Sequence, residues 1–293
     1  MRPALIYVLL LGSLCSTHLQ AQTIEVKPQV QQESAPIQDN SFLLEEAYNQ
    51  EDGVIQHISY FQIQPQSGEW LYTQTDEWPL RSLKHQLSVT LSAAHDGSMP
   101  GSGGGWGDAA VNYRYQLVGS GESKVAIAPR LSLLVPSGNP KYDRGSGGVG
   151  LQTNLPISIQ HSPRWVTNWN VGATWVPRAQ DAQKNYASTA GVNLGQSVIW
   201  LATARVNFLV ETIWIGNQYV TGPNRTAWSQ DLYISPGIRW AYNLRNGLQI
   251  VPGLGIPLGI GPSAGQKGII MYLSFEHPFA FAHSRAKGSG VNE

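Results

Sequence analysis

The stretch from Lys124 to Gln160 reads KVAIAPRLSLLVP, then SGNPKYDRGSGG, then VGLQTNLPISIQ, and its pattern decides the fold. In the first and last parts, apolar residues alternate with small or polar ones; the apolar set is Val125, Ile127, Leu131, Leu133, Val135, Val149, Leu151, Leu155, Ile157 and Ile159. Successive residues of a strand point to opposite faces, so each part predicts a strand with one apolar face and one polar face. The middle part is rich in Gly, Asn, Pro and Asp, and it predicts the loop of a hairpin.

The same unit of two amphipathic strands and a polar loop recurs to the end of the chain. About twelve strand-like runs are recognisable by their alternation, and they lie at residues 54–64, 68–78, 84–95, 107–118, 124–136, 148–160, 164–176, 187–200, 204–216, 229–242, 247–258 and 268–279. Their connections are tight turns on one side and mostly long, Gly-rich loops on the other, residues 217–228 among them, which is typical of outer-membrane barrels. The sequence therefore predicts an all-β fold, a transmembrane antiparallel up-and-down β-barrel of about 12 strands at residues 54–281, followed by a tail at residues 282–293.

The predicted strand ends carry most of the tryptophans, namely Trp70, Trp106, Trp175, Trp214 and Trp228 beside the long loops and Trp78, Trp165, Trp200 and Trp240 beside the tight turns. Amphipathic rings collect at both lipid–water interfaces, so this distribution predicts two aromatic girdles. A soluble β-sandwich or β-solenoid is the alternative fold. It would use tryptophans as anchors between sheets and does not place them at strand ends.

The charge content is low and balanced, with 19 Lys and Arg against 19 Asp and Glu. Charged residues make up 13% of the chain, against ~25% in typical soluble domains, which fits a protein that presents an apolar band to lipid. A chain without excess positive charge is not expected to bind nucleic acid. The one cysteine of the sequence is Cys15 in the signal region, so disulfides and thiol catalysis are excluded from the mature protein.

The first residues, MRPALIYVLLLGSLCSTHLQAQ, combine Arg2, a short apolar core and Ala21 at a cleavage position. This pattern predicts a secretory signal peptide at residues 1–21. A lipoprotein signal at Cys15 is the alternative, but Leu14 does not suit it.

Residues 22–53 form a predicted periplasmic leader, which is polar and expected to be disordered up to residue 38. Asn40 or Ser41 can cap a short helix with the sequence FLLEEAYNQ. One side of this helix is apolar, so we expect it either to pack at the barrel mouth or to act as a plug or as a docking segment for a periplasmic partner. The candidate plug residues are Phe42, Leu43, Glu45 and Glu46.

The two faces of the predicted strands differ in polarity. The apolar face, with residues such as Leu87, Val111, Phe208 and Leu254, is expected to contact lipid. Nearly all charged strand residues fall on the opposite face, because a charge that faces lipid destabilises a barrel. The charged candidates for the lumen lining are Arg114, Arg130, Arg205, Glu211, Asp231, Arg239 and Glu276.

The motifs do not indicate an enzyme. The stretch GSGGGWG at Gly101–Gly107 lacks the Lys-Ser/Thr pair and the helix of a phosphate-binding loop. The histidines are not at metal-ligand spacing, and we expect neither a metal nor another cofactor. His57 and Ser59 share a strand face, but the sequence offers no third group of a hydrolase triad, so the protein is not expected to be an enzyme.

The last predicted strand indicates a partner in assembly. The stretch Gln266–Leu273 has a polar residue, then a glycine, then spaced apolar residues. It resembles the C-terminal signal that the barrel-assembly machinery reads, which implies that this machinery is a partner.

Three segments of the chain stand out: DNSFLLEEAYNQEDGVIQHI (Asp39–Ile58), GWGDAAVNYRYQL (Gly105–Leu117) and VPSGNPKYDRGSGGVGLQTNLPISI (Val135–Ile159). Together they resemble outer-membrane transporters of the MetA-pathway of phenol degradation family. The resemblance implies a barrel in the cell outer membrane, in contact with outer-membrane lipid and associated with uptake of aromatic or hydrophobic compounds. Two functions therefore stay open: a channel or transporter for small-molecule solutes, or a non-transporting structural or adhesive envelope barrel.

Overall fold

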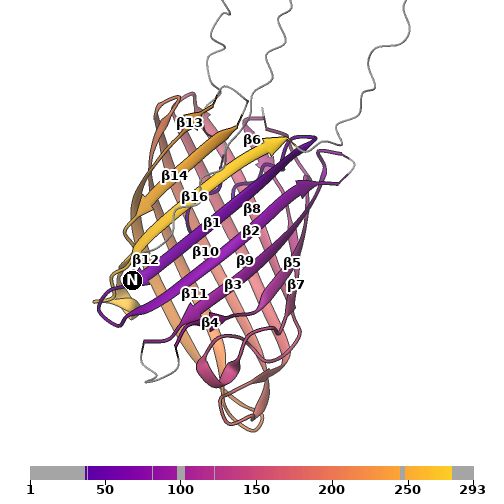
Figure 1. Ribbon diagram of the computed structural model, residues 1–293, viewed down its shortest axis with the longest axis vertical. Helices are drawn as coiled ribbons and strands as arrows, with labels where there is room; N and C mark the ends of the chain where they lie inside the picture. Colours follow the sequence, from indigo (N-terminus) through magenta and orange to yellow (C-terminus); the bar gives the residue numbers. More distant parts are fainter. Residues whose placement is uncertain are drawn as a thin grey trace, which may run out of the picture. The chain divides into compact units, whose positions relative to one another are not determined.

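The computed structural model describes residues 37, 39–80, 82–97, 103–121, 123–244 and 248–278. The predicted signal peptide at residues 1–21, the leader up to residue 36 and the tail at residues 282–293 lie outside the described residues. Within the described part of the chain, a 12-strand antiparallel sheet closes into a barrel (Figure 1). The predicted fold class is confirmed.

Each strand of the wall pairs with the next one along the chain. The wall strands are β1 (Val54–Gln64), β2 (Glu69–Pro79), β3 (His85–His95), β5 (Ala109–Tyr115), β7 (Arg130–Val135), β8 (Gly150–Ser162), β9 (Trp165–Gln180), β10 (Tyr186–Thr203), β11 (Val206–Gly222), β12 (Arg225–Trp240), β14 (Gln249–Gly255) and β16 (Ile269–Pro278). Short elements extend or flank them, namely β4 (Gly105–Trp106), β6 (Val125–Ile127), β13 (Tyr242–Asn243), β15 (Leu258–Gly259) and the 3-10 turns η1 (Pro140–Tyr142) and η2 (Gly261–Ser263). The last strand returns to the first, with Tyr272 of β16 opposite Tyr60 of β1, so the sheet closes on itself.

Residues 217–228 form strand and turn, and the prediction of a long loop there is wrong. β11 continues to Gly222, β12 begins at Arg225, and Asn224 in the turn between them has a φ of 54°. Asn adopts this left-handed conformation more readily than most residues. The polar sequence on both sides concealed the strands, because alternation marks only the part of a strand that has one apolar face.

Pro129 interrupts the predicted strand at residues 124–136 and separates β6 from β7. Proline lacks the N–H that a continuous ladder needs. The flanking backbone groups still find partners, since Tyr115 N donates to Pro129 O at 3.0 Å and Ala128 N donates to Pro156 O at 3.2 Å. The wall is therefore hydrogen-bonded on both sides of the interruption.

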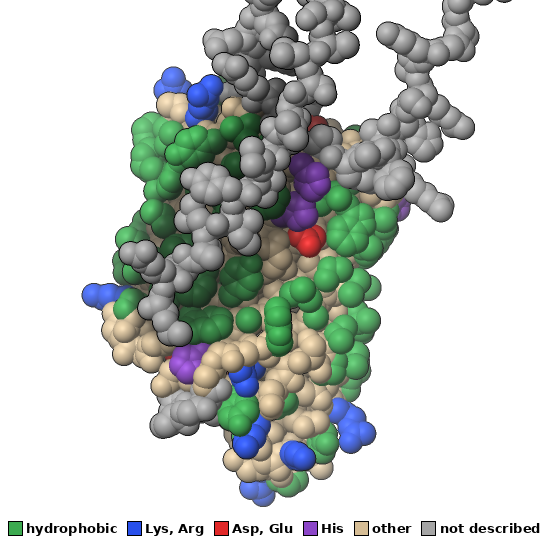
Figure 2. All heavy atoms as spheres, viewed as in Figure 1, with side chains coloured by type: hydrophobic (Ala, Val, Ile, Leu, Met, Phe, Trp, Pro, Cys, Tyr) green, Lys and Arg blue, Asp and Glu red, His purple; other side chains and the backbone are tan. Residues whose placement is uncertain are grey.

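The outer and inner faces of the wall differ in polarity, as the sequence predicts. Large apolar side chains are exposed on the outside, among them Leu91, Val111, Leu133, Leu151, Phe208, Val210, Leu254 and Met271. Polar side chains are buried on the inside, among them Gln86, Asn112, Ser132, Asn154, Asn168, Ser197 and Asn207. Figure 2 shows hydrophobic side chains over the outer face of the strands, and Lys and Arg near the strand ends. A closed barrel with an exposed apolar band is the arrangement that a bilayer requires.

Aromatic rings mark two levels on the outer surface. Trp165, Trp200 and Phe208 stack in a row near the tight turns, with ring centroids 6.3 Å and 5.6 Å apart. Trp175 and Trp228 are about half exposed on the strand halves nearer the loops. These positions correspond to the two girdles expected at the lipid–water interfaces.

The predicted short helix at residues 42–50 is wrong. These residues form an irregular, bent segment without helical hydrogen bonds. Their backbone amides bond to side chains of the barrel wall, as described below, and those partners outcompete the hydrogen bonds within the segment that a helix would need. Within the described residues, no helix is long and apolar enough to span a membrane.

Candidate functional site in the barrel lumen

Residues 39–50, called the luminal segment from here on, run around the inside of the barrel wall. Along the segment, Asp39 contacts β16, β12 and β1, Ser41 contacts β10, Leu43 contacts β11, Glu45 contacts β9, Ala47 contacts β8, Asn49 contacts Arg114 of β5 and Gln50 contacts β3. The two ends meet at Gln56 of β1, which donates to Asp39 Oδ1 at 3.0 Å and accepts from Gln50 Nε2. The segment therefore forms a ring that follows the inner circumference of the barrel.

Wall side chains take up the backbone amides of the luminal segment at alternate positions. Leu43 N donates to Glu211 Oε1 at 2.8 Å, Glu45 N to Asn170 Oδ1 at 3.0 Å, Ala47 N to Ser158 Oγ at 2.8 Å and Asn49 N to Gln116 Oε1 at 2.9 Å. Buried amides must find a partner, and here the polar inner face supplies it. The polar face of the wall thus serves as a binding surface for main chain.

Two buried arginines bind the carbonyl groups of the luminal segment. Arg239 is 1% exposed, and its Nη1 donates to Asp39 O at 2.6 Å and to Asn40 O at 2.8 Å. Arg114 is 3% exposed, and its Nη2 donates to Tyr48 O at 2.6 Å. Guanidinium groups offer several donors in a fixed plane, which suits binding to neighbouring carbonyls. Each end of the segment is therefore held by one arginine.

Asp39 fixes the start of the luminal segment to the last strand. Its Oδ1 accepts from Tyr272 Oη at 2.6 Å, and its Oδ2 accepts from Ser274 Oγ. Burial raises the pKa of Asp39 above its usual value, and the nearby charge of Arg239 opposes this shift. The carboxyl group is thus embedded among donors of the wall.

Glu45 pairs with two arginines of the wall, at 2.9 Å with Arg130 and at 4.0 Å with Arg114. Its Oε1 lies 2.9 Å from Arg130 Nη2 and accepts from Asn154 Nδ2 at 3.0 Å. Arg130 also donates to Gln152 Oε1 at 2.9 Å. This cluster joins the segment to β7 and β8.

Inward-facing glycines make room for two apolar side chains of the segment. A Cβ atom on Gly195 would lie 2.3 Å from Leu44 Cδ2, and one on Gly253 would lie 2.5 Å from Phe42 Cε1. Carbon atoms cannot approach so closely without displacement, so only glycine fits beneath these side chains as they stand. The ring of Phe42 also packs on Tyr272, with centroids 5.3 Å apart.

Glu46 carries a shifted pKa at the centre of this arrangement. Burial raises the pKa of Glu46 to about 8, and the charge of Asp39 adds to the shift, whereas Arg239 and Arg114 oppose it. Its side chain therefore holds a proton at pH values where an exposed glutamate is ionised.

The luminal segment brings together part of the predicted lumen set. Arg114, Arg130, Glu211 and Arg239 all bind it. Arg205 is exposed in the turn between β10 and β11, because β10 ends at Thr203 and β11 begins at Val206. Asp231 accepts from Ser263 Oγ at 2.8 Å beside η2, and Glu276 lies on β16 opposite Gln56.

The candidate plug residues all lie inside the barrel, although not on a helix. Phe42 and Leu43 pack in an apolar cluster with Ile199, Leu209 and Ile270, while Glu45 pairs with Arg130 and Glu46 lies among Asp39, Arg114 and Arg239. Sequence reasoning missed the contributions of Ser158, Ser197 and the inward glycines. Small residues on a polar strand face give no sign in the sequence that they contact another segment, so their role is visible only when that segment is located.

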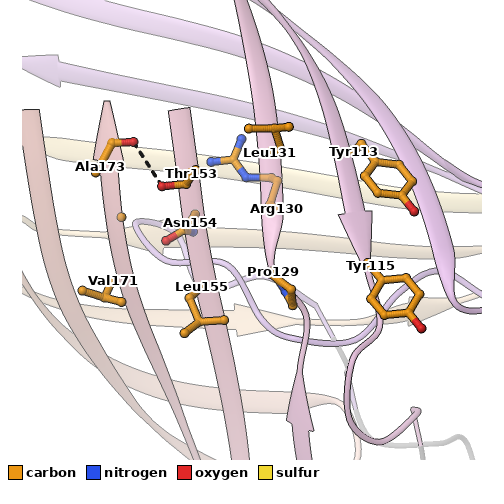
Figure 3. A pocket seen from close by; sticks show the side chains of 11 residues that line it. Tyr113, Tyr115, Pro129, Arg130, Leu131, Thr153, Asn154, Leu155, Val171 and Ala173 are labelled. Atoms are coloured by element: carbon orange, nitrogen blue, oxygen red, sulfur yellow. Dashed lines mark hydrogen bonds between the residues drawn. The ribbon is translucent and has the colours of Figure 1, made fainter. Parts of the chain in front are cut away.

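A groove of about 610 Å³ lies on the outer wall beside Pro129. Figure 3 shows its lining, which includes Tyr113, Tyr115, Leu131, Leu155 and Val171. Arg130 and Asn154 also line it, and both contact Glu45 of the luminal segment. The outer groove and the luminal segment are thus separated by a thin polar layer.

A polar cluster on the outer surface is an exception to the predicted sorting of charge. His57 Nδ1 lies 2.7 Å from Asp76 Oδ1, and the His57 ring stacks on His277 at a centroid distance of 5.0 Å. Ser59 Oγ donates to Gln74 Oε1 at 2.6 Å, so the hydroxyl is bound to Gln74 and not to His57. Among the described residues, no group of three or more His, Cys, Asp or Glu side chains could hold a metal ion.

Comparisons with known proteins find solved structures that are similar to this barrel. No protein-family model matches the sequence, and no curated protein matches it. The COG4313 outer membrane channel from Pseudomonas putida F1 is similar with a TM-score of 0.53 and 12% sequence identity, covering 80% of this chain and 98% of that chain. The NanC porin has a TM-score of 0.49 at 9% identity over 77% of this chain and 100% of its own, and the CymD monoaromatic hydrocarbon channel has 0.37 at 11% identity over 80% and 90%.

The COG4313 channel shares the barrel fold of this chain, and at 12% identity the similarity shows the fold alone. The closed barrel, the exposed apolar band and the shared fold agree with one another. The protein is a β-barrel of the cell outer membrane.

Proposed function

We propose that the protein is an outer-membrane channel or transporter for small molecules, aromatic or hydrophobic ones among them, and that the luminal segment is its removable plug. This assignment agrees with the resemblance to the MetA-pathway of phenol degradation family. One observation carries it: the lumen is occupied by residues of the chain that bind to the wall mainly through hydrogen bonds.

The hydrogen bonds that hold the plug can be exchanged for water. A buried hydrogen bond contributes only about 0.5–1.5 kcal/mol net, because both groups bond to water when they separate. Wall side chains such as Asn170, Ser158 and Gln116 would remain solvated in an open lumen. A purely structural barrel would more simply fill its interior with interlocked bulky side chains of the wall. The polar inner face therefore favours a lumen that opens.

The apolar cluster beside the plug supports solutes with apolar surface. Phe42, Ile199, Leu209, Ile270 and Tyr272 are all buried in this cluster inside the barrel. A solute that enters the lumen meets these side chains as well as the polar ones. Aromatic and hydrophobic molecules gain from such contacts, whereas strongly hydrated ions do not.

A disulfide lock tests the channel function. Ser41 Oγ donates to Ser197 Oγ at 2.8 Å, so cysteines at both positions are close enough to form a disulfide between plug and wall. The mature chain has no cysteine of its own, because Cys15 falls in the predicted signal peptide. In proteoliposomes with the Ser41→Cys/Ser197→Cys variant, we expect phenol influx to equal that of protein-free liposomes after oxidation and to exceed it after reduction.

The matched control places a disulfide within the wall. Thr75 Oγ1 and Thr90 Oγ1 lie 2.9 Å apart, so Thr75→Cys/Thr90→Cys joins β2 to β3 without touching the luminal segment. Its influx is expected to be the same in both redox states. Influx no faster than in protein-free liposomes from every variant, the reduced lock included, would favour the structural or adhesive barrel.

We also propose that the barrel-assembly machinery inserts this barrel into the membrane. β16 begins at Ile269 and carries the apolar part of the stretch that resembles its signal, and this strand closes the barrel against β1. Depletion of the machinery in cells is expected to lower the amount of heat-modifiable, folded barrel. An unchanged amount of folded barrel in cells depleted of the machinery would contradict its role as an assembly partner.

A further inference from the structure

Three glycines of the wall form a socket for one aromatic ring. A Cβ atom on Gly237, Gly253 or Gly255 would lie 2.6 Å, 2.5 Å or 2.9 Å from carbon atoms of the Phe42 ring. The ring therefore lies directly against the main chain of β12 and β14, and we call these residues the glycine socket. Tyr272 borders the ring from β16 at a centroid distance of 5.3 Å. The socket is shaped for a flat ring.

Two buried polar atoms beside the glycine socket lack a hydrogen-bond partner among the described residues. They are Ser235 Oγ and Glu211 Oε2, on residues that are both 0% exposed and face each other across β11 and β12. Ser235 Oγ lies 3.4 Å from the point where a Cβ on Gly255 would stand, and a Phe42 ring carbon lies 2.9 Å from the same point. Buried polar atoms are almost always paired, because an unpaired one destabilises the structure. The hydrocarbon ring of Phe42 cannot supply the missing bonds.

We propose that the glycine socket is a binding site for an aromatic ring that carries a hydroxyl group, and that Phe42 occupies it as an internal competitor. The ring of phenol has the size of the Phe42 ring. Its hydroxyl group donates to Glu211 Oε2 and accepts from Ser235 Oγ, which are the atoms without partners.

Binding at the socket is coupled to the plug because both occupants cannot be present together. A solute in the glycine socket displaces Phe42, and the neighbouring bond from Leu43 N to Glu211 Oε1 then loses its alignment. The solute thus shifts the lumen toward its open state by its difference in affinity for the two states. This coupling to transport rests on the proposed function, whereas the binding site does not.

The first experiment removes the Phe42 ring from the glycine socket and then fills the socket with a methyl group. Fluorine NMR of para-fluorophenol with the full-length protein in lipid nanodiscs measures affinity. Phe42→Ala is expected to bind about tenfold more tightly than the wild type, since apparent affinity scales with the fraction of free sites. Phe42→Ala/Gly253→Ala places a methyl group where the ring lay and is expected to lose this gain. In this double variant the methyl group added at position 253 fills part of the space that the Phe42 ring leaves. Heat-modifiable gel mobility reports whether the barrel is folded.

A matched exchange outside the socket serves as the control. Leu44→Ala/Gly195→Ala makes the same swap at the other close contact of the luminal segment, where a Cβ would lie 2.3 Å from Leu44. This variant is expected to bind para-fluorophenol as the wild type does. Equal affinity of Phe42→Ala and Phe42→Ala/Gly253→Ala would overturn the site.

The second experiment tests recognition of the hydroxyl group. In the Phe42→Ala background, para-fluorophenol is expected to bind more tightly than para-fluorotoluene, and Ser235→Ala is expected to reduce this preference about tenfold. Equal binding of the two compounds to Phe42→Ala would overturn hydroxyl recognition. Socket-dependent binding without influx through the reduced disulfide lock contradicts the channel function and leaves the site in place. Influx through the reduced lock, together with equal binding to Phe42→Ala and Phe42→Ala/Gly253→Ala, contradicts the binding site and leaves the channel function in place.

Discussion

Replacing Arg239 by methionine removes the clamp on the start of the luminal segment. The Nη1 atom of Arg239 donates to Asp39 O at 2.6 Å and to Asn40 O at 2.8 Å, and methionine keeps much of the side-chain length without any donor. A hydrogen bond to a charged group contributes about 1.5–3 kcal/mol, and because one nitrogen serves both carbonyls we expect a loss of about 2–4 kcal/mol in docking free energy. At 1.4 kcal/mol per factor of ten, the released fraction rises roughly 30- to 1000-fold.

Two measurements report the released fraction. Planar-bilayer recordings give the fraction of time that a single Arg239→Met barrel conducts, and cleavage by a glutamate-specific protease at Glu45 or Glu46 reports exposure of the luminal segment. Arg205→Met is the matched control, because Arg205 is exposed in a turn. If Arg239→Met and Arg205→Met conduct alike and are cleaved at the same rate, the clamp does not hold the plug and the reasoning is refuted.

Three further predictions concern the wall, the plug and a loop. Leu133 is 45% exposed on the outer face of β7, and Leu133→Arg is expected to lower the free energy of unfolding in bilayers by about 2–4 kcal/mol near the bilayer midplane; an unshifted urea midpoint would contradict this. Burial raises the pKa of Glu46 from 4.5 to about 8, so the docked segment keeps a proton that the released segment loses, and closure weakens as pH rises through this window. Glu46→Gln is expected to flatten the pH dependence of channel opening between pH 4.5 and about 8 in channel recordings. A pH profile equal to that of the wild type would contradict a role of the Glu46 proton in closure. Asp108 accepts hydrogen bonds from two amides of the loop at residues 137–147, so Asp108→Ala should expose this loop to trypsin while the folded barrel keeps its gel mobility; continued resistance of the loop would be the contrary result.

The strands and their two faces could be predicted from the sequence because alternation is a local property. Leu133 and Ser132 are neighbours, yet one is 45% exposed on the outside and the other is 0% exposed on the inside, as period-two sorting requires. The charged residues follow the same rule, with Asp76 on the outer surface as an exception. Its partner His57 lies on the adjacent strand, and no local pattern reveals that contact.

The course of the luminal segment could not be predicted, because its partners are remote in sequence. Leu43 N bonds to a residue 168 positions away, Glu45 N to one 125 positions away and Ala47 N to one 111 positions away. Helix propensity in FLLEEAYNQ is a local signal, and these contacts override it. The glycines of β12 and β14 likewise weaken a strand when viewed alone, and their purpose emerges only with the ring of Phe42 against them.

The most direct test of the account is disulfide formation between the luminal segment and one face of a single strand. Ser41 and Ser197 are 156 positions apart in sequence and 2.8 Å apart at their hydroxyl oxygens, and Val198, the next residue on β10, is exposed on the outer face. After mild oxidation of cell envelopes, Ser41→Cys/Ser197→Cys is expected to migrate as a crosslinked form on non-reducing gels, and Ser41→Cys/Val198→Cys is expected not to. Crosslinking of both pairs, or of neither, would contradict a segment that lies inside the barrel and contacts its inner wall.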